Sequence, residues 1–532
     1  MTENPNPTPP NQTPPKPTPP TWLSVFLIYN NILYDSDHIN DPNNKYISIQ
    51  TETDSLYQSL KDIPFDLRCK IIIVQVRVFF TPKHGTPTGL FQSITVSEKF
   101  DTPVKNDRIN PSAKVTVPPA IDTLVAEDAV KNVLTQVFEA YPADRRMVIT
   151  FGHGSVLGIN MMPLLQPLQY SLMHPKKDED PDKNTDDSPD DKDGMPIGND
   201  DCSGLGNLSA LTSQGLEQYF LKHNLNLLSN VSFARAITGA LGAVGVAKLD
   251  LLVMFNCLMQ NIFTQYEFRD CVDYLVAPVS GISYPAYDWV DVFTQIINNQ
   301  NASNSVDYSN RDIAGLFLSN TGIIARGKAH RSHPHYEDEI INTWKLNAIQ
   351  LDKALFEKIQ QAFAAFLTSL SNQAVKQQLY ICLSVVQRQL LKYNSYCLPS
   401  VMIVDLYVLT KYLPSMIKQL GYKNTSQEID DVYNKCMQLN NILAQVDSQV
   451  YFGDKFYNSD SGYYYIDCAT EFKYENNKGI GFWFPEIMQN CDLLMDILNQ
   501  KSPVWQPSFV TDTPGFVQFF SDFASWGSPI IA

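Results

Sequence analysis

The sequence has no run of about 18 unbroken apolar residues, which is the length that a membrane-spanning helix needs. Its first residues, MTENPNPTPPNQTPPKPTPP, lack the basic start and the apolar stretch of a secretory signal peptide. Basic side chains are also in deficit, because 40 Lys and Arg stand against 56 Asp and Glu, a net charge of −16. Surfaces that bind nucleic acid or anionic membranes need the opposite balance. We therefore expect a cytoplasmic protein that binds neither.

Metal-ligand spacings are missing as well. None of the nine cysteines forms a CxxC pair, and their odd number is typical of reduced thiols. The histidines of His330-Arg-Ser-His333-Pro-His335 could ligate a metal, but the proline and the loop context favour a solvated surface. An acidic stretch at 178–193, with nine Asp or Glu in sixteen residues, lacks the glycine and the closing glutamate of a calcium loop. The sequence therefore predicts no metal site.

Composition divides the chain into three parts. Residues 1–20 are a Pro, Thr and Asn tract that cannot bury a core and should be disordered. Residues 21–345 alternate apolar strands with helices, which is typical of a parallel sheet covered on both faces. Within them, an insert at about 175–205 carries the acidic stretch and should be solvated. Residues 346–532 read as a mainly helical C-terminal subdomain packed on this core.

Individual elements follow from length and periodicity. In the segment 124–140, apolar residues recur every four positions on one face, which predicts a helix. Short apolar runs rich in β-branched and aromatic residues predict strands. The expected strands are 22–29, 69–80, about 90–96, 147–151, 251–255, 274–277 and 479–485; further helices are expected at 51–63, within 211–250, at 346–370, roughly 373–393 and 401–420.

Two of the predicted strands end in reactive side chains. One ends in Phe151-Gly-His153-Gly154 and the other in Phe255-Asn-Cys257. Reactive groups of parallel sheets collect at the carboxyl ends of the strands, where a histidine can activate a thiol. The backbone N–H groups of Gly154 and Cys257 could then stabilise an oxyanion. Taken alone, a cysteine after an apolar strand is more often packed and inert, so these residues leave the chemistry open.

A resemblance decides between these interpretations. The segment Asp250-Leu-Leu-Val-Met-Phe-Asn-Cys257-Leu-Met resembles the nucleophile region of the clostripain family, whose pattern there is Asp-Leu-Ile-Gly-Phe-Asp-Ala-Cys-Leu-Met. Residues 148–155 resemble the family's histidine strand, and 404–407 and 479–485 resemble segments downstream of its catalytic core. This ordered resemblance spans roughly residues 22–490. It implies a caspase-like three-layer α/β/α sandwich with a mainly parallel sheet.

The resemblance also implies a function and a site. The chain would be a cysteine endopeptidase that cleaves proteins or peptides through an acyl-enzyme on Cys257, with His153 as the base. The family has an acid two positions before the nucleophile, which is associated with preference for Arg or Lys before the cut bond. Here that position is Phe255, so the specificity is expected to differ. We expect the substrate pocket to involve Phe255, Asn256, Asp288 and Trp289, either as an apolar wall or with Asp288 supplying the charge.

Several alternatives stay open. The acidic insert lies between the two catalytic strands, where such peptidases are often cut, so Lys176 or Lys177 is a candidate processing site; a tolerated surface insertion explains the insert equally well. Calcium dependence, known among relatives, is a second open point. A catalytically silent caspase-like scaffold protein would explain the replaced acid, and an acyl-transfer ligase would use the same dyad. The sequence gives no oligomeric state.

Overall fold

A computed structural model of the chain describes residues 21–29, 71–82, 90–99, 110–111, 115, 126–161, 226–256, 258–278, 289–301, 309–319, 346–370, 376, 380–381, 402–420, 427–450, 478–484 and 506–527. The Pro-rich tail, the helix predicted at 51–63 and the acidic insert lie outside these ranges. Within them, no helix is both long enough and apolar enough to cross a membrane.

The architecture is organised around one large sheet. Its strands are β1 (Trp22–Tyr29), β2 (Ile71–Pro82), β3 (Leu90–Lys99), β4 (Asn110–Pro111), β5 (Arg145–Phe151), β9 (Leu249–Phe255), β10 (Val272–Pro278), β11 (Leu346–Gln350) and β13 (Ser448–Val450). Among the described residues these nine strands run in the order β13-β11-β10-β9-β5-β1-β2-β3-β4. The five central strands, from β10 to β2, are parallel, and the strands at both edges are antiparallel. The predicted mainly parallel core is confirmed.

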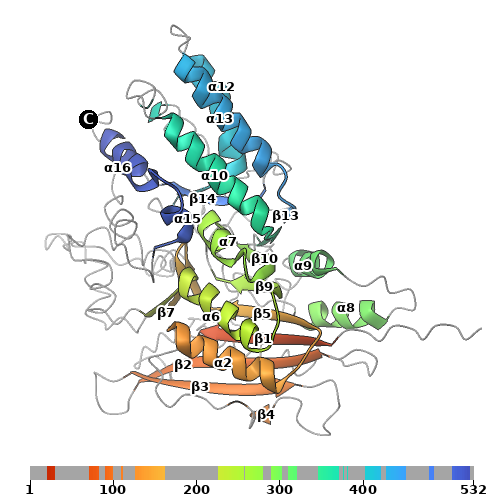
Figure 1. The fold of residues 1–532 in the computed structure, drawn as a ribbon. Coiled ribbons are helices and arrows are strands. Elements are labelled where there is room, and N and C mark those ends of the chain that lie inside the picture. The colour runs from red at the N-terminus through yellow and green to blue at the C-terminus, as the bar shows by residue number, and fades with distance from the viewer. Residues whose placement is uncertain are drawn as a thin grey trace, which may run out of the picture.

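Helices cover both faces of this sheet. On one face, helix α2 (Glu127–Ala140) packs beside α6 (Asn230–Ala243) (Figure 1). Arg146, the register partner of Leu23, stacks on Phe138 of α2. On the other face, Phe26 meets Trp289 of α8 (Trp289–Asn301) with ring centroids 5.2 Å apart. Leu23 and Phe26 are three positions apart on β1, so their side chains point to opposite faces of the sheet. Helices α2 and α8 therefore cover opposite faces, as the predicted α/β/α sandwich requires.

Burial explains why these segments form strands and helices. All eight residues of β1 are buried, as expected for a central parallel strand that is covered on both faces. Helix α2 buries Ala129, Val133 and Val137, which recur at helical spacing along the face that meets the sheet. The strands and helices predicted in these regions are confirmed.

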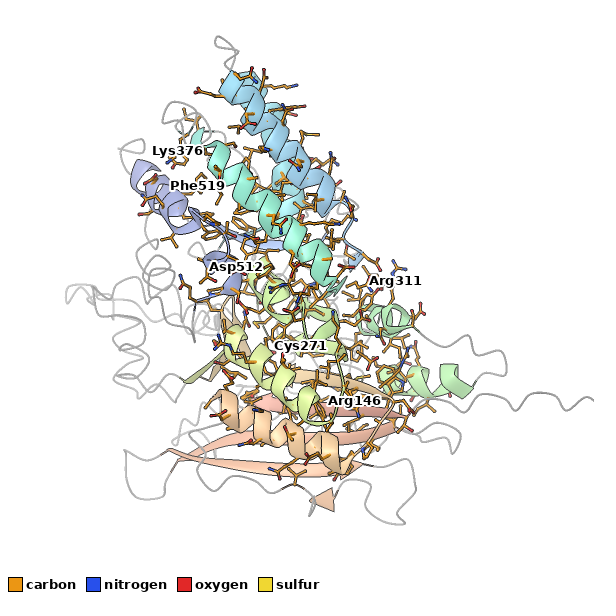
Figure 2. The ribbon with its side chains drawn as sticks, in the orientation of Figure 1. Arg146, Cys271, Arg311, Lys376, Asp512 and Phe519 are labelled. Atoms are coloured by element: carbon orange, nitrogen blue, oxygen red, sulfur yellow. The ribbon has the colours of Figure 1, made fainter. Side chains whose placement is uncertain are left out.

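The C-terminal part builds a second, mainly helical layer. Helices α10 (Lys353–Ser369), α12 (Leu406–Leu420), α13 (Gln427–Leu443) and α16 (Phe516–Gly527) lie together at one end of the molecule (Figure 1). Phenylalanine rings from α10, α16 and the strand β14 (Gly481–Phe484) pack against one another. Lys376, labelled near Phe519 in Figure 2, pairs with Asp522 of α16 at 2.8 Å. Since β11 and β13 nevertheless join the large sheet, the division after residue 345 stays a prediction.

Two helix predictions were wrong at their starts. Leu346–Gln350, predicted as helix, is strand β11, and the helix begins at Lys353 because the Asp352 side chain accepts a hydrogen bond from the Leu355 N–H at 2.9 Å. Met402–Asp405 is likewise a strand, β12, which pairs with β14. There the Asp405 carboxylate accepts from the Val408 N–H at 3.1 Å, and α12 begins at Leu406. Each cap marks a boundary that apolar periodicity alone does not show.

Candidate active site

The two predicted catalytic positions follow neighbouring strands of the sheet. Strands β5 and β9 are parallel, and Phe151 is paired with Phe255 at their ends. His153 and Cys257 each stand two residues beyond this pair. The backbone of His153 begins strand β6 (His153–Ser155), while its side chain and all of Cys257 lie outside the described residues. In the sequence, both positions therefore come directly after the carboxyl ends of two paired parallel strands, and the dyad itself stays a prediction.

The turn into His153 requires a glycine. Gly152 has φ +145°, a conformation that side chains exclude, and an added Cβ would come within 2.6 Å of the Tyr29 carbonyl oxygen. The chain thus leaves β5 by passing directly over the end of β1. Gly154 follows in β6, where it is buried and pairs with Ile159 of β7 (Gly158–Met161). Its role in an oxyanion hole stays a prediction.

Asn256 connects the two strand ends. The side chain is fully buried, and its Oδ1 accepts a hydrogen bond from the Thr150 hydroxyl at 2.5 Å. Its Nδ2 donates to the carbonyl oxygen of Gly152 at 3.0 Å. Both partners belong to the strand end that carries His153, whereas Asn256 directly precedes Cys257. Sequence reasoning assigned this residue to the substrate pocket and gave no sign of this connection, which depends on the register of β5 and β9.

A second asparagine holds the loop after the nucleophile. Leu258 has φ +65°, a conformation that is rare for a residue with a branched side chain and often marks a functional site. Asn261 Nδ2 donates to the Leu258 carbonyl at 2.7 Å and to the Val156 carbonyl, in the turn after β6, at 3.3 Å. Its Oδ1 accepts from the Thr264 N–H at 3.0 Å and starts helix α7 (Ile262–Phe268). Asn261 therefore joins the loops that follow both predicted catalytic residues.

The predicted pocket residues do not lie on one side of the sheet. The Phe255 ring meets Trp289 at 4.9 Å in a T-shaped contact and meets Phe151 at 6.3 Å. Both Phe255 and Trp289 are buried on the face that α8 covers. Asn256, the next residue, points to the opposite face toward Thr150. The structure thus brings Phe255 and Trp289 together and separates Asn256 from them; Asp288 lies outside the described residues.

The pair of C-terminal strands β12 and β14 contacts the loop after the predicted nucleophile, and Asp405 at the end of β12 holds the main chain that makes the contact. Its Oδ2 accepts hydrogen bonds from the N–H groups of Lys478, Gly479 and Ile480 at 3.0, 2.8 and 3.2 Å. The next residue, Gly481, forms an isolated bridge with Asn261. This contact connects the C-terminal layer to the loop of the predicted nucleophile. Sequence reasoning matched both segments to the family but did not foresee that they touch.

Two other cysteines serve as internal references for thiol reactivity. Cys271 and Cys436 are buried, and burial raises the pKa of both thiols to about 12. Cys271, labelled in Figure 2, is 1% exposed. We expect neither to react when the folded protein is treated with iodoacetamide at pH 7.5 for several minutes, and both to react in urea. Mass spectrometry of the alkylated peptides checks this; rapid labelling of Cys271 in the native protein would contradict it.

The remaining sequence candidates lie beyond the described part of the chain. Lys176, Lys177 and the acidic insert are in this group, so the processing site and calcium binding stay predictions. In the part that the structure describes, no group of three or more His, Cys, Asp or Glu side chains is placed to hold a metal ion.

Comparison with known proteins supplies the family. A model described as the clostripain family of peptidases matches residues 230–510, just over half of the 532 residues. Two solved structures are described as a secreted cysteine protease from Bacteroides thetaiotaomicron with an irreversible peptide inhibitor and an inactive zymogen protease from Parabacteroides distasonis. The first is 12% identical, covers 95% of this chain and 99% of its own, and has a TM-score of 0.39. The second is 10% identical, covers 93% and 99%, and has a TM-score of 0.42.

Likenesses at these TM-scores support no statement about the site. No curated protein matches the sequence. The first neighbour is described as secreted, and the cytoplasmic location expected for this chain stays a prediction.

Proposed function

The chain belongs to the clostripain family of cysteine peptidases, and from this we propose that it hydrolyses protein or peptide substrates through an acyl-enzyme on Cys257, with His153 as the base. The observation that carries the proposal is the register of β5 and β9. Because Phe151 and Phe255 are paired, the positions of His153 and Cys257 follow neighbouring strand ends at equal offsets. The two asparagine connections described above tie these strand ends and their loops together.

The proposed reaction has two halves. His153 takes the proton of the Cys257 thiol, and the thiolate attacks the carbonyl carbon of the scissile peptide bond. The N–H groups of Gly154 and Cys257 stabilise the oxyanion of the tetrahedral intermediate. This intermediate collapses to a thioester as the leaving amine takes the proton from His153. Water, activated by the same histidine, then hydrolyses the thioester and returns the thiol.

For specificity, we propose that cleavage does not require Arg or Lys before the cut bond. The family's acid is replaced by Phe255, whose ring packs against Trp289. An aromatic wall offers no carboxylate to pair with a guanidinium or an ammonium group. An apolar residue before the cut bond fits this wall better, and Asp288 is the alternative source of a charge.

A diverse peptide library tests the activity and the specificity together. Wild-type protein and Cys257→Ala are incubated with the library, with and without calcium, and the products are identified by mass spectrometry. We expect cuts from the wild type only, most of them after apolar residues. Basic residues before the cuts would indicate that a carboxylate such as Asp288 reaches the pocket. No cuts under any condition would favour the catalytically silent scaffold, and amide-bonded products formed with an added amine would favour the ligase.

A further inference from the structure

We propose that Asn256 is a positioning residue that fixes the predicted nucleophile and base relative to each other, an inference that rests on the proposed Cys257–His153 dyad. Asn256 is covalently next to Cys257, and its amide donates to the Gly152 carbonyl at 3.0 Å. That carbonyl belongs to the peptide group whose nitrogen is the nitrogen of His153. One side chain therefore links the main chain at both predicted catalytic residues.

Both ends of the amide are used, which fixes its orientation. Thr150 donates its hydroxyl proton to Oδ1 at 2.5 Å, so Nδ2 is the end that faces the Gly152 carbonyl. An aspartate at this position would place a carboxylate oxygen, an acceptor, against the Gly152 carbonyl, which is also an acceptor. An alanine would remove the hydrogen bonds that Asn256 forms with the Thr150 hydroxyl and the Gly152 carbonyl. The clostripain-family pattern has an alanine at this position, which cannot form these two hydrogen bonds.

The main chain to which Asn256 bonds is also packed against a neighbouring strand. A Cβ added to Gly152 would lie 2.6 Å from the Tyr29 carbonyl oxygen, so the main chain at Gly152 packs closely against the end of β1. The main chain just before His153 therefore contacts both the end of β1 and the side chain of Asn256. Because Asn256 is fully buried, water does not compete for these hydrogen bonds. Loss of the amide would remove the hydrogen bond that ties this main chain to the strand end before Cys257.

The test measures the alkylation rate of Cys257 by iodoacetamide between pH 5 and pH 9, read from the Cys257 peptide by mass spectrometry. The proteins are the wild type, Asn256→Ala and His153→Ala. A thiolate held by a nearby imidazolium reacts at pH 6, where an isolated thiol does not. We expect Asn256→Ala to lose at least about tenfold in rate at pH 6, in the direction of His153→Ala. In peptide cleavage, kcat should fall by about 10- to 100-fold while KM stays within about twofold.

Variants of Thr150 separate positioning from general loss of structure. Thr150→Val removes the hydroxyl that orients the amide and is expected to shift the pH profile in the same direction. Thr150→Ser keeps the hydroxyl and should restore the wild-type profile. Thr368→Val, which removes the hydroxyl that the exposed Thr368 of α10 donates to the Ala364 carbonyl, is the control for the same substitution far from the site and should leave the profile unchanged. These variants decide the question also if Asn256→Ala does not fold.

The possible results are distinct. If His153→Ala changes the profile but Asn256→Ala and Thr150→Val do not, the positioning role is overturned and the proposed function stands. If His153→Ala itself leaves the wild-type profile unchanged, the dyad is wrong and the positioning role falls with it. If Asn256→Ala lowers only the melting temperature, with kcat and the profile unchanged, the residue is structural and the inference is overturned.

Discussion

Replacing His153 with alanine is expected to lower kcat/KM for peptide cleavage by about 10³-fold, because the Cys257 thiol loses the group that takes and returns its proton. The backbone of His153 starts β6 directly after the glycine that passes over β1, so its position is set by the main chain. The variant should therefore keep the β5–β9 ladder and fold normally. Steady-state kinetics on the best peptide from the library measures the effect.

Added imidazole provides the control for this variant. If the missing function is proton transfer, imidazole in solution should restore part of the activity of His153→Ala and none of the activity of Cys257→Ala. A loss of less than about threefold would show that another group is the base. A full loss that imidazole does not relieve, together with a lower melting temperature, would indicate a folding defect instead of a catalytic one.

Replacing Asp405 with alanine is expected to lower the free energy of unfolding by about 3 kcal/mol, since each buried donor that loses its acceptor costs about 1–3 kcal/mol. Four main-chain N–H groups donate to this carboxylate, one from Val408 and three from residues 478–480. Partial access to solvent at Asp405 lets water replace some of these bonds, which keeps the loss below the sum of four. Urea unfolding followed by tryptophan fluorescence measures it.

Asp431→Ala is the matched control, because Asp431 is an exposed aspartate of α13 and its removal should change the free energy by less than about 0.5 kcal/mol. A loss below 1 kcal/mol in Asp405→Ala would show that the carboxylate does not hold β14.

The effect of Asp405 should also depend on pH. Desolvation raises its pKa from 3.8 to about 6, although the four N–H groups oppose the shift. Between these two values the folded chain binds more protons at this site than the unfolded chain does. The contribution of Asp405 to stability therefore falls as the pH rises from about 4 to about 6 and is constant above that. Asp405→Ala should accordingly cost more at pH 4.5 than at pH 7.5, and an equal cost at both would contradict the shift.

The central sheet could be predicted from the sequence because its strands are continuous apolar runs. The segments 22–29 and 147–151 are buried on both faces, and no helical or alternating pattern competes with their assignment. At 346–350 the same reasoning failed, because five residues of mixed polarity lead directly into an amphipathic helix. Only Asp352, read as a cap, marks the boundary. The antiparallel pairing of β11 with β10 depends on distant segments and has no local signal.

The candidate site shows the same division between local and distant information. The reactive residue types at two strand ends could be read from the sequence, and the family pattern added their proposed roles. The proposed positioning role of Asn256 could not be read from the sequence. Its partners Thr150 and Gly152 lie about a hundred positions earlier and are brought to it only by the register of β5 and β9. Asn261 could have been recognised as a helix cap, but not as a donor to the Val156 carbonyl.

The connection between the two strand ends has a consequence for a chain that is cut. Residues 162–225 link them in sequence, but the β5–β9 ladder, the pairing of β7 with β8 (Asn226–Ser229), and the contact of α2 with α6 link them in space. A break in that linking segment, as proposed at Lys176 or Lys177, would convert one polypeptide into a non-covalent heterodimer with a shared core. Its two polypeptides would purify together under native conditions and separate only in denaturant, so gel electrophoresis of a native preparation distinguishes nicking from degradation.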